Sequence, residues 1–427
     1  MIDRRDDLYG AASPQELAAE TYENYKRFVN PPLARVMKLS GSPVEVRASG
    51  ATIWDQNGKA YLDFAGGYGV FTLGHRHPRV LDAVRAQLER MALSGKTMFN
   101  VMLGRASRRL AELAPGDLEI SFWCNSGTEA IEGAIKLARA ATGRAKIVGT
   151  SGAYHGKTLG ALSISGRETF QAPFRPLLAD STCIPYGDAG ALDEALADAA
   201  AFVVEPVQGE GGVYVPPLGY LAAVRAACDR AGALFVADEV QTGLGRCGYR
   251  FACDREGVVP DVITLAKGLS GGIVPVGAFV ARPSVWQRAF GNAPLLHTST
   301  FGGSELACAA ALAAMDALEE EGLAQRSREL GERLLRGAQA LGAQYPRVVS
   351  EVRGLGLLVG VELTHEGYGG WIIPEMLKAG VTAAWTLNQQ RVIRLEPPLI
   401  VTEAEVDLAL QALHGGIATA FEKLGEL

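Results

Sequence analysis

The sequence lacks a long apolar run, because nowhere does an uncharged apolar stretch reach about 18 residues. Its N-terminus, "MIDRRDDLYGAASPQELAAE", is charged and has no apolar core of the kind found in signal peptides. Basic residues are scattered, and the formal net charge is −6, which argues against nucleic acid or an acidic membrane surface as a partner. We therefore expect a cytoplasmic protein whose partners are small molecules.

Cysteine is also sparse, with six residues far apart and no C-x-x-C pair. Reduced thiols are the expected state in the cytosol. His75 and His77 form an H-x-H before Pro78, but no carboxylate or cysteine cluster nearby completes a metal site. We interpret this segment as a turn before a helix, and the sequence predicts no bound metal.

A regular alternation of strands and helices is present between about residues 120 and 285. Two segments have helical patterns, "TEAIEGAIKLARAA" and "YLAAVRAACDRAG". Short apolar runs predict the strands "ISFWCN", "AKIVGT", "AAFVVEPV", "ALFVADEV", "DVITLAK" and "VGAFVA". This order is typical of an α/β fold with a mostly parallel sheet. The pattern changes near residue 325, so a smaller C-terminal unit is expected there, in keeping with a length that suggests two or three domains.

Polar groups follow three of the predicted strands. Asp238 ends "LFVAD", and Lys267 follows "DVITLA". Asn125, Ser126, Gly127 and Thr128 follow "ISFWC" and open a strongly helical segment. Free backbone N–H groups and hydroxyls at such a helix start can hold a phosphate, although taken alone the segment is better explained as an ordinary N-cap. Ligands of parallel sheets bind at the carboxyl ends of strands.

The combination of a phosphate cradle, an acid and an amine predicts pyridoxal 5′-phosphate (PLP) as the cofactor. Lys267 provides the amine that binds its aldehyde, and Asp238 provides the carboxylate that keeps its pyridine nitrogen protonated. Tyr154 and His155 follow another strand, where they can stack on the ring.

A dinucleotide site is the competing interpretation of the glycines Gly243, Gly245 and Gly248, which form G-x-G-x-x-G with Asp261 further on. The segment after them, "YRFACDREGVVPD", is not an amphipathic helix, so the helix N-terminus that would bind a pyrophosphate is missing. We therefore disfavour dinucleotide binding.

Several motifs follow one another along more than 300 residues of the chain. These are "YLDFAGGYGVFTLGHRHP", "CNSGTEAIEGAIKLARA", "SGAYHGKTLGALSISG", "VEPVQGEGGVYVPPLGYL", "ADEVQTGLGRCG", "DVITLAKGLSGG", "TSTFGGSELACAAALA" and "IRLEPPLIVTEAEVD". In this order they give the chain a specific resemblance to the class III (omega) aminotransferases of PLP fold type I. It implies a large PLP-binding domain over 66–325, with a mostly parallel central sheet flanked by helices. A smaller α+β domain would combine the N-terminal segment 1–65 with residues 326–427.

The resemblance also implies roles for individual residues. Gln241 would bond the hydroxyl of the cofactor ring, and Tyr154 would stack on that ring. Thr300 in "HTSTFGG" would reach the phosphate of a neighbouring subunit, which implies a homodimer with shared active sites and leaves the choice between dimer and tetramer open. The residues implied for the phosphate, the aldehyde and the pyridine nitrogen are the same as above: Ser126, Gly127, Thr128, Lys267 and Asp238.

Substrate selection is implied to rest on Glu210 and Arg394. In related omega-aminotransferases these positions form a switch. The arginine binds the α-carboxylate of a keto acid, and the glutamate neutralises the arginine when a donor without that carboxylate enters. A structural ion pair is the alternative explanation. "GAYHGKTLGALS", "FACDREGVVPD" and "TLNQQRVIRLEPPL" are most similar to the putrescine aminotransferase subfamily, whereas Tyr68, expected at the substrate, and Trp371 depart from its pattern.

The expected function is transfer of a terminal amino group from a putrescine-like diamine, or a related amine, to 2-oxoglutarate or pyruvate. Alternatives on the same fold are an aminomutase, an ornithine- or acetylornithine-type aminotransferase, and a biosynthetic aminotransferase for a long-chain or carrier-bound aldehyde. A binding protein without PLP is disfavoured, because Lys267 and Asp238 are both present.

Overall fold

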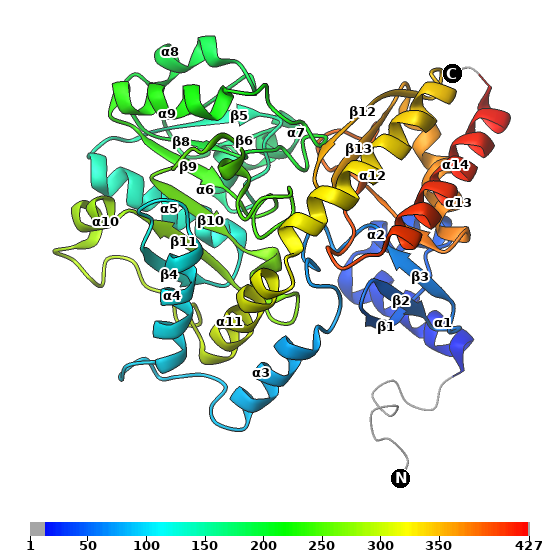
Figure 1. Ribbon diagram of the computed structural model, residues 1–427, viewed down its shortest axis with the longest axis horizontal. Coiled ribbons are helices and arrows are strands. Elements are labelled where there is room, and N and C mark those ends of the chain that lie inside the picture. Colours follow the sequence, from blue (N-terminus) through cyan, green and yellow to red (C-terminus); the bar gives the residue numbers. More distant parts are fainter. Residues whose placement is uncertain (1–12, 426–427) are drawn as a thin grey trace.

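The computed structural model describes residues 13–425 and contains one large sheet and two smaller ones (Figure 1). The large sheet has the strand order β4-β11-β10-β9-β8-β5-β6, and β7 pairs with β5. Its strands are β4 (Ile120–Cys124), β5 (Lys146–Ser151), β6 (Ser165–Gly166), β7 (Ser181–Ile184), β8 (Ala199–Val204), β9 (Leu234–Asp238), β10 (Val262–Leu265) and β11 (Gly277–Ala281). Only the pairings of β11 with β10 and β4 are antiparallel, so the predicted mostly parallel sheet is confirmed.

Strands β8 to β11 are buried over their full length because helices cover both faces of the sheet. In β9, Phe235 and Ala237 point into one hydrophobic core and Val236 points into the other, as the two-residue period of a strand requires. The core of Val236 is completed by α5 (Gly127–Thr142) and α10 (Pro283–Phe290). The opposite core contains residues of α4 (Val101–Leu113), α9 (Tyr220–Ala231) and α11 (Glu305–Glu320).

The first and last parts of the chain lie side by side at one end of the molecule (Figure 1). Strand β14 (Val381–Thr382) pairs in parallel with β3 (Ala60–Asp63), so residues from both ends of the chain share one sheet. That sheet also contains β1 (Glu45–Ser49) and β2 (Thr52–Asp55), and the third sheet contains β12 (Val349–Leu355), β13 (Leu358–Leu363), β15 (Ala384–Trp385) and β16 (Val392–Leu395). The proposed domain limits at residues 65 and 325 stay a prediction.

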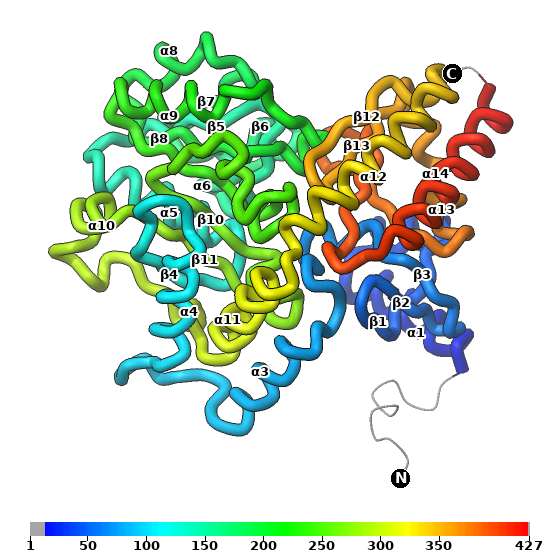
Figure 2. The backbone as a smooth tube through the Cα atoms, in the orientation of Figure 1, coloured from blue at the N-terminus to red at the C-terminus, as the bar shows by residue number. Residues whose placement is uncertain are grey.

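The remaining helices lie around these sheets. Helix α12 (Leu323–Gln344) runs from the large sheet to the C-terminal part as one long yellow segment (Figure 2). The others are α1 (Pro14–Asn24), α2 (Pro31–Leu39), α3 (Pro78–Leu88), α6 (Leu159–Ser163), α7 (Glu168–Gln171), α8 (Leu192–Leu196), α13 (Gly369–Lys378) and α14 (Glu403–Leu424). Among residues 13–425, no helix combines the length and the apolar character needed to cross a membrane.

Candidate active site

A cavity of about 580 Å³ opens where the parallel strands of the large sheet end. It collects residues from the start of α5, the loop after β5 and the ends of β9 and β10. The predicted site residues in its lining are Ser126, Gly127, Thr128, Tyr154, His155, Asp238, Gln241 and Lys267. The structure therefore brings together side chains that are more than 100 residues apart in the sequence.

The start of α5 offers free hydrogen-bond donors to this cavity. The Ser126 side chain caps the helix by accepting from Glu129 N, whereas within residues 13–425 the N–H groups of Gly127 and Thr128 donate to no acceptor. Gly156 lets the loop after β5 approach this turn closely, because a Cβ atom there would lie 2.2 Å from Thr128 Oγ1. Unpaired N–H groups at a helix start are a suitable cradle for a phosphate.

Asp238 is held in one orientation by three contacts. One oxygen, Oδ1, accepts hydrogen bonds from Thr264 Oγ1 at 3.0 Å and from Val240 N at 3.1 Å. The other, Oδ2, lies 2.6 Å from His155 Nδ1. Burial lowers the pKa of His155, but the hydrogen bond and charge of Asp238 outweigh this and raise it above its ordinary value. The pair thus keeps a carboxylate fixed at the cavity.

Lys267 begins the short 3₁₀ helix η6 (Lys267–Ser270), separated by one residue from the end of β10. Its φ of 45° lies in the left-handed region, which residues other than glycine occupy only where the surrounding structure holds them. Burial lowers the pKa of its amine, and the nearby Glu396 and Glu210 only partly oppose this. A neutral amine is the form that can act as a nucleophile or accept a proton.

These features fit PLP. The free N–H groups at α5 suit its phosphate, the oriented Asp238 carboxylate suits a protonated pyridine nitrogen, and the Lys267 amine suits an aldehyde. His155 has a different contact from the one expected, because its ring bonds Asp238, and Tyr154 is left as the aromatic residue with a half-buried ring at the cavity.

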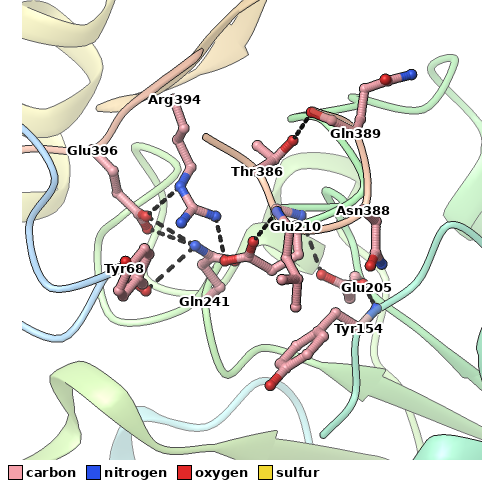
Figure 3. Close-up of polar contacts among 12 residues, drawn as sticks. Tyr68, Tyr154, Glu205, Glu210, Gln241, Thr386, Asn388, Gln389, Arg394 and Glu396 are labelled. Carbon is pink, nitrogen blue, oxygen red and sulfur yellow. Dashed lines mark hydrogen bonds and ion pairs between the residues drawn. The ribbon is translucent and has the colours of Figure 1, made fainter. Parts of the chain in front are cut away.

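A second cavity, of about 830 Å³, shares Lys267 and Tyr154 with the first. Arg394, from β16, lies beside it with only 1% of its surface exposed and is flanked by two carboxylates (Figure 3). Its Nη1 donates to Glu210 Oε1 at 2.6 Å, and its Nε lies 3.1 Å from Glu396 Oε2. Burial raises the pKa of Glu210, but the charge of Arg394 outweighs this and lowers it. Glu210 and Arg394 therefore form the charged pair expected from the sequence.

The structure gives contacts or positions for three further predicted site residues, Gln241, Tyr68 and Thr300. The Gln241 amide donates to Glu396 Oε2 at 2.9 Å as well as lining the first cavity (Figure 3). Tyr68 is 56% exposed, lines the second cavity, and has the Arg394 guanidinium 5.5 Å from its ring centre. Thr300 is exposed in the loop between α10 and α11 and lines neither cavity, so its proposed role toward a neighbouring subunit stays a prediction.

Two buried carboxylates of the site were missed in the sequence. Glu205 accepts backbone N–H groups of Tyr154 at 2.9 Å and Gly209 at 3.1 Å. Glu396 bonds Gln241 and lies beside Arg394. Both stand in motifs that carried the resemblance, "VEPVQGE" and "VIRLEPPL", so the signal was a charged residue next to proline within an otherwise apolar run.

The other sequence features have structural partners. His75 Nε2 lies 2.8 Å from Asp63 Oδ2, and His77 Nε2 lies 2.9 Å from Glu321 Oε1. Within residues 13–425 no group of three or more metal-ligating side chains is present. The glycines Gly243, Gly245 and Gly248 are in turns and are followed by a 3₁₀ helix, η5 (Ala252–Glu256), so the helix of a dinucleotide site is absent at this point.

Residues 40–417 match the family described as Aminotransferase class-III. A crystal structure of ornithine aminotransferase from Toxoplasma gondii ME49 is 33% identical, with 98% of each chain covered and a TM-score of 0.87. A second Toxoplasma gondii structure, described as having partial occupancy of PLP at the active site, is 34% identical over 95% of this chain and 98% of that one, with a TM-score of 0.84. An (S)-enantioselective omega-transaminase from Thermomicrobium roseum is 30% identical over 94% of this chain and 99% of that one, with a TM-score of 0.87.

Proposed function

Because this chain belongs to the class III aminotransferases, which are PLP-dependent enzymes acting on amine donors and keto-acid acceptors, we propose that its donor is a diamine or a related terminal amine and that its acceptor is 2-oxoglutarate or pyruvate. The observation that carries the proposal is the distance of 2.6 Å between Arg394 Nη1 and Glu210 Oε1. An arginine neutralised by its own carboxylate leaves a site that accepts an amine without a carboxylate.

Each cofactor contact is part of the proposal. When bound, PLP supplies an electron sink that lets a proton leave the donor carbon. The Gly127 and Thr128 N–H groups and the Ser126 hydroxyl would hold the phosphate, Tyr154 would stack on the ring, and Asp238 would hold the pyridine proton. The Lys267 Nζ, whose pKa is lowered by burial, would take the proton that leaves the donor carbon.

The same arginine serves the second substrate. A keto acid carries a carboxylate next to its carbonyl, and the Arg394 guanidinium can bind such a group in a two-pronged contact. Within residues 13–425, Arg394 Nη2 is buried and has no hydrogen-bond partner, so a donor is already free for this contact. Glu210 then swings away and the acceptor takes its place.

The diamine is favoured by the similarity of "TLNQQRVIRLEPPL" to putrescine aminotransferases. The second candidate is an ornithine-type activity, which is supported by the likeness to the Toxoplasma gondii enzyme. We retain the homodimer as a proposal, in which the exposed Thr300 completes the phosphate site of the neighbouring subunit.

Single-turnover kinetics of the two half-reactions test the switch. Arg394→Ala should lower kcat/KM for 2-oxoglutarate by about 30- to 1,000-fold, because a charge-assisted bidentate contact worth roughly 2–4 kcal/mol is lost. The half-reaction with a diamine should change far less. Glu210→Gln should act in the opposite sense and slow the diamine half-reaction, since Arg394 is then left without its neutralising carboxylate.

Arg391→Ala is a matched control, because Arg391 is three residues away and pairs with Glu362 at 2.8 Å on the outside of the site. It should leave both half-reactions within about twofold. Equal losses in both half-reactions for Arg394→Ala and Glu210→Gln would mean that this pair is only structural.

A further inference from the structure

The second cavity continues outward from Lys267 to a part of the chain that no step above uses. Its far end is formed by the short 3₁₀ helix η7 (Glu366–Tyr368) and by the first turn of α13. The charged side chains in its lining are Lys267, Glu210 and Glu366. Since Glu210 is paired with Arg394, Glu366 is the carboxylate left to meet a ligand at the outer end.

Glu366 is exposed, and within residues 13–425 its carboxylate accepts no hydrogen bond and forms no ion pair. Its acidic neighbours differ in this respect. Glu362 lies 2.6 Å from Arg353, and Glu375 lies 2.6 Å from Lys378. An unpaired carboxylate at the mouth of an active-site cavity is a suitable partner for a cation.

An aromatic surface lines the same cavity as this carboxylate. Trp385, on β15, packs so closely against the start of α13 that a Cβ atom on Gly369 would lie 2.6 Å from its Nε1. The indole nevertheless keeps 44% of its surface exposed and lines the cavity together with Tyr68 and Tyr154. The faces of aromatic rings attract ammonium groups.

The wall that carries Trp385 is fixed to the reaction centre. Leu387 N donates to Glu210 Oε2 at 2.7 Å, and the Asn388 side chain donates to Gly152 O at 2.9 Å. Trp385 itself pairs with Ile393 across β15 and β16. The distance between the reaction centre and the outer end is therefore set by the fold, which suits a donor of defined length.

We propose that Glu366 and Trp385 form the subsite for the distal ammonium group of a diamine whose other amino group reacts at Lys267. The inference rests on the proposed function and adds the residues that select the donor. The methylene chain lies along Tyr154 and Leu387, while the distal cation meets the indole face and the Glu366 carboxylate.

Paired donors of equal length test the subsite in the holoenzyme: 1,4-diaminobutane against 1-aminobutane, and 1,5-diaminopentane against 1-aminopentane. Glu366→Gln should lower kcat/KM for each diamine by about 5- to 10-fold and leave each monoamine within about twofold, since only the diamine has a charge at the outer end. Trp385→Leu should show the same selectivity. Glu422→Gln, an exposed glutamate on α14, is the control and should change neither donor.

Charge reversal gives a second readout. Glu366→Lys should raise the rate with 4-aminobutanoate relative to 1,4-diaminobutane, because the outer end then favours a carboxylate. Added salt should reduce the advantage of diamines over monoamines in the wild type and have little effect on it in Glu366→Gln. The half-reaction with pyruvate, which carries no distal charged group, should be unchanged in all of these variants.

The outcomes separate this inference from the proposed function. A wild-type enzyme that accepts 1,4-diaminobutane, but whose diamine-to-monoamine ratio is the same in Glu366→Gln and Trp385→Leu, would overturn the subsite and leave the proposed function standing. A wild-type enzyme that accepts no diamine would overturn both.

Discussion

Glu205 is buried between two loops, and both of its carboxylate oxygens accept backbone N–H groups. One bond holds Tyr154, and the other holds Gly209 beside the proposed switch residue Glu210. Burial raises the pKa of Glu205 to about 7, against an ordinary value near 4.5. The protonation of this one carboxyl group depends on the pH of the solution. It therefore affects the positions of Tyr154 and of the loop that carries Glu210.

The direction in which Glu205 changes the stability of the protein with pH can be measured. Between about pH 4.5 and pH 7 the folded protein retains a proton on Glu205 that the unfolded chain has released, so the stability due to this group falls as pH rises through that window. From pH 5 to pH 8 the cofactor-free wild type should lose on the order of 2 kcal/mol more free energy of unfolding than Glu205→Gln. Urea unfolding at both pH values checks this.

Glu194→Gln, at an exposed position on α8, should follow the wild type at both pH values. If the free energy of unfolding changed with pH equally in Glu205→Gln and in the wild type, Glu205 would have to stay ionised throughout.

The residues that could be predicted from sequence are those at the ends of strands. Asp238 and Lys267 each follow a continuous apolar run, and such an end can be placed in a parallel sheet without knowing its neighbours. Glu205 and Glu396 were missed because their partners are defined only by the folded chain: Tyr154 for the first, and Gln241 and Arg394 for the second.

At the scale of elements, the proposed phosphate cradle depends on how closely the loop after β5 meets α5. Gly156 has a φ of 130° and faces Thr128. The Gly156→Ala variant should lose roughly 1–3 kcal/mol of stability and bind PLP at least about 10-fold more weakly, because the added methyl group displaces Thr128. Thermal unfolding and a fluorescence titration with PLP measure the two effects.

Gly143→Ala provides the matched control at the opposite end of α5 from the proposed cradle. Gly143 caps the C-terminus of α5 at a φ of 69° with open space around it. The Gly143→Ala substitution should cost about 1 kcal/mol of stability and leave PLP affinity unchanged. Equal effects of the two variants on PLP affinity would contradict this account of the cradle.

Elements were predictable where their apolar runs were long. The runs quoted for six strands became β4, β5 and β8 to β11, and both helical patterns became α5 and α9. The reversed direction of β11 was not predicted, because a strand buried on both faces has the same apolar pattern in either direction. Strands β6 and β14 have two residues each, too few to show a period.

At the scale of the whole molecule, Arg246 joins the large sheet to the C-terminal part. It is fully buried, and its Nη1 donates to Leu357 O at 3.0 Å and Pro397 O at 2.5 Å. Its Nε lies 3.8 Å from Glu396 Oε1. Arg246→Met should lower the free energy of unfolding by about 3–5 kcal/mol, because two carbonyl groups and a carboxylate lose a buried partner. Urea unfolding is the measurement.

Arg105→Met, at an exposed position on α4, should stay within about 0.5 kcal/mol of the wild type. An Arg246→Met protein that is as stable as Arg105→Met would mean that water replaces the guanidinium at this junction.

Strand β3 pairs with β14, and Glu396 N donates to Phe64 O across roughly 330 residues of chain. A ribosome delivers the chain from its N-terminus, so β1 to β3 must wait for their last partner until most of the protein has emerged. During that interval the nascent chain already holds Asp238 and Lys267 but not yet Arg394. Synthesis therefore imposes an order in which Asp238 and Lys267, the side chains proposed to bind the cofactor, are made before the arginine proposed to choose the substrate.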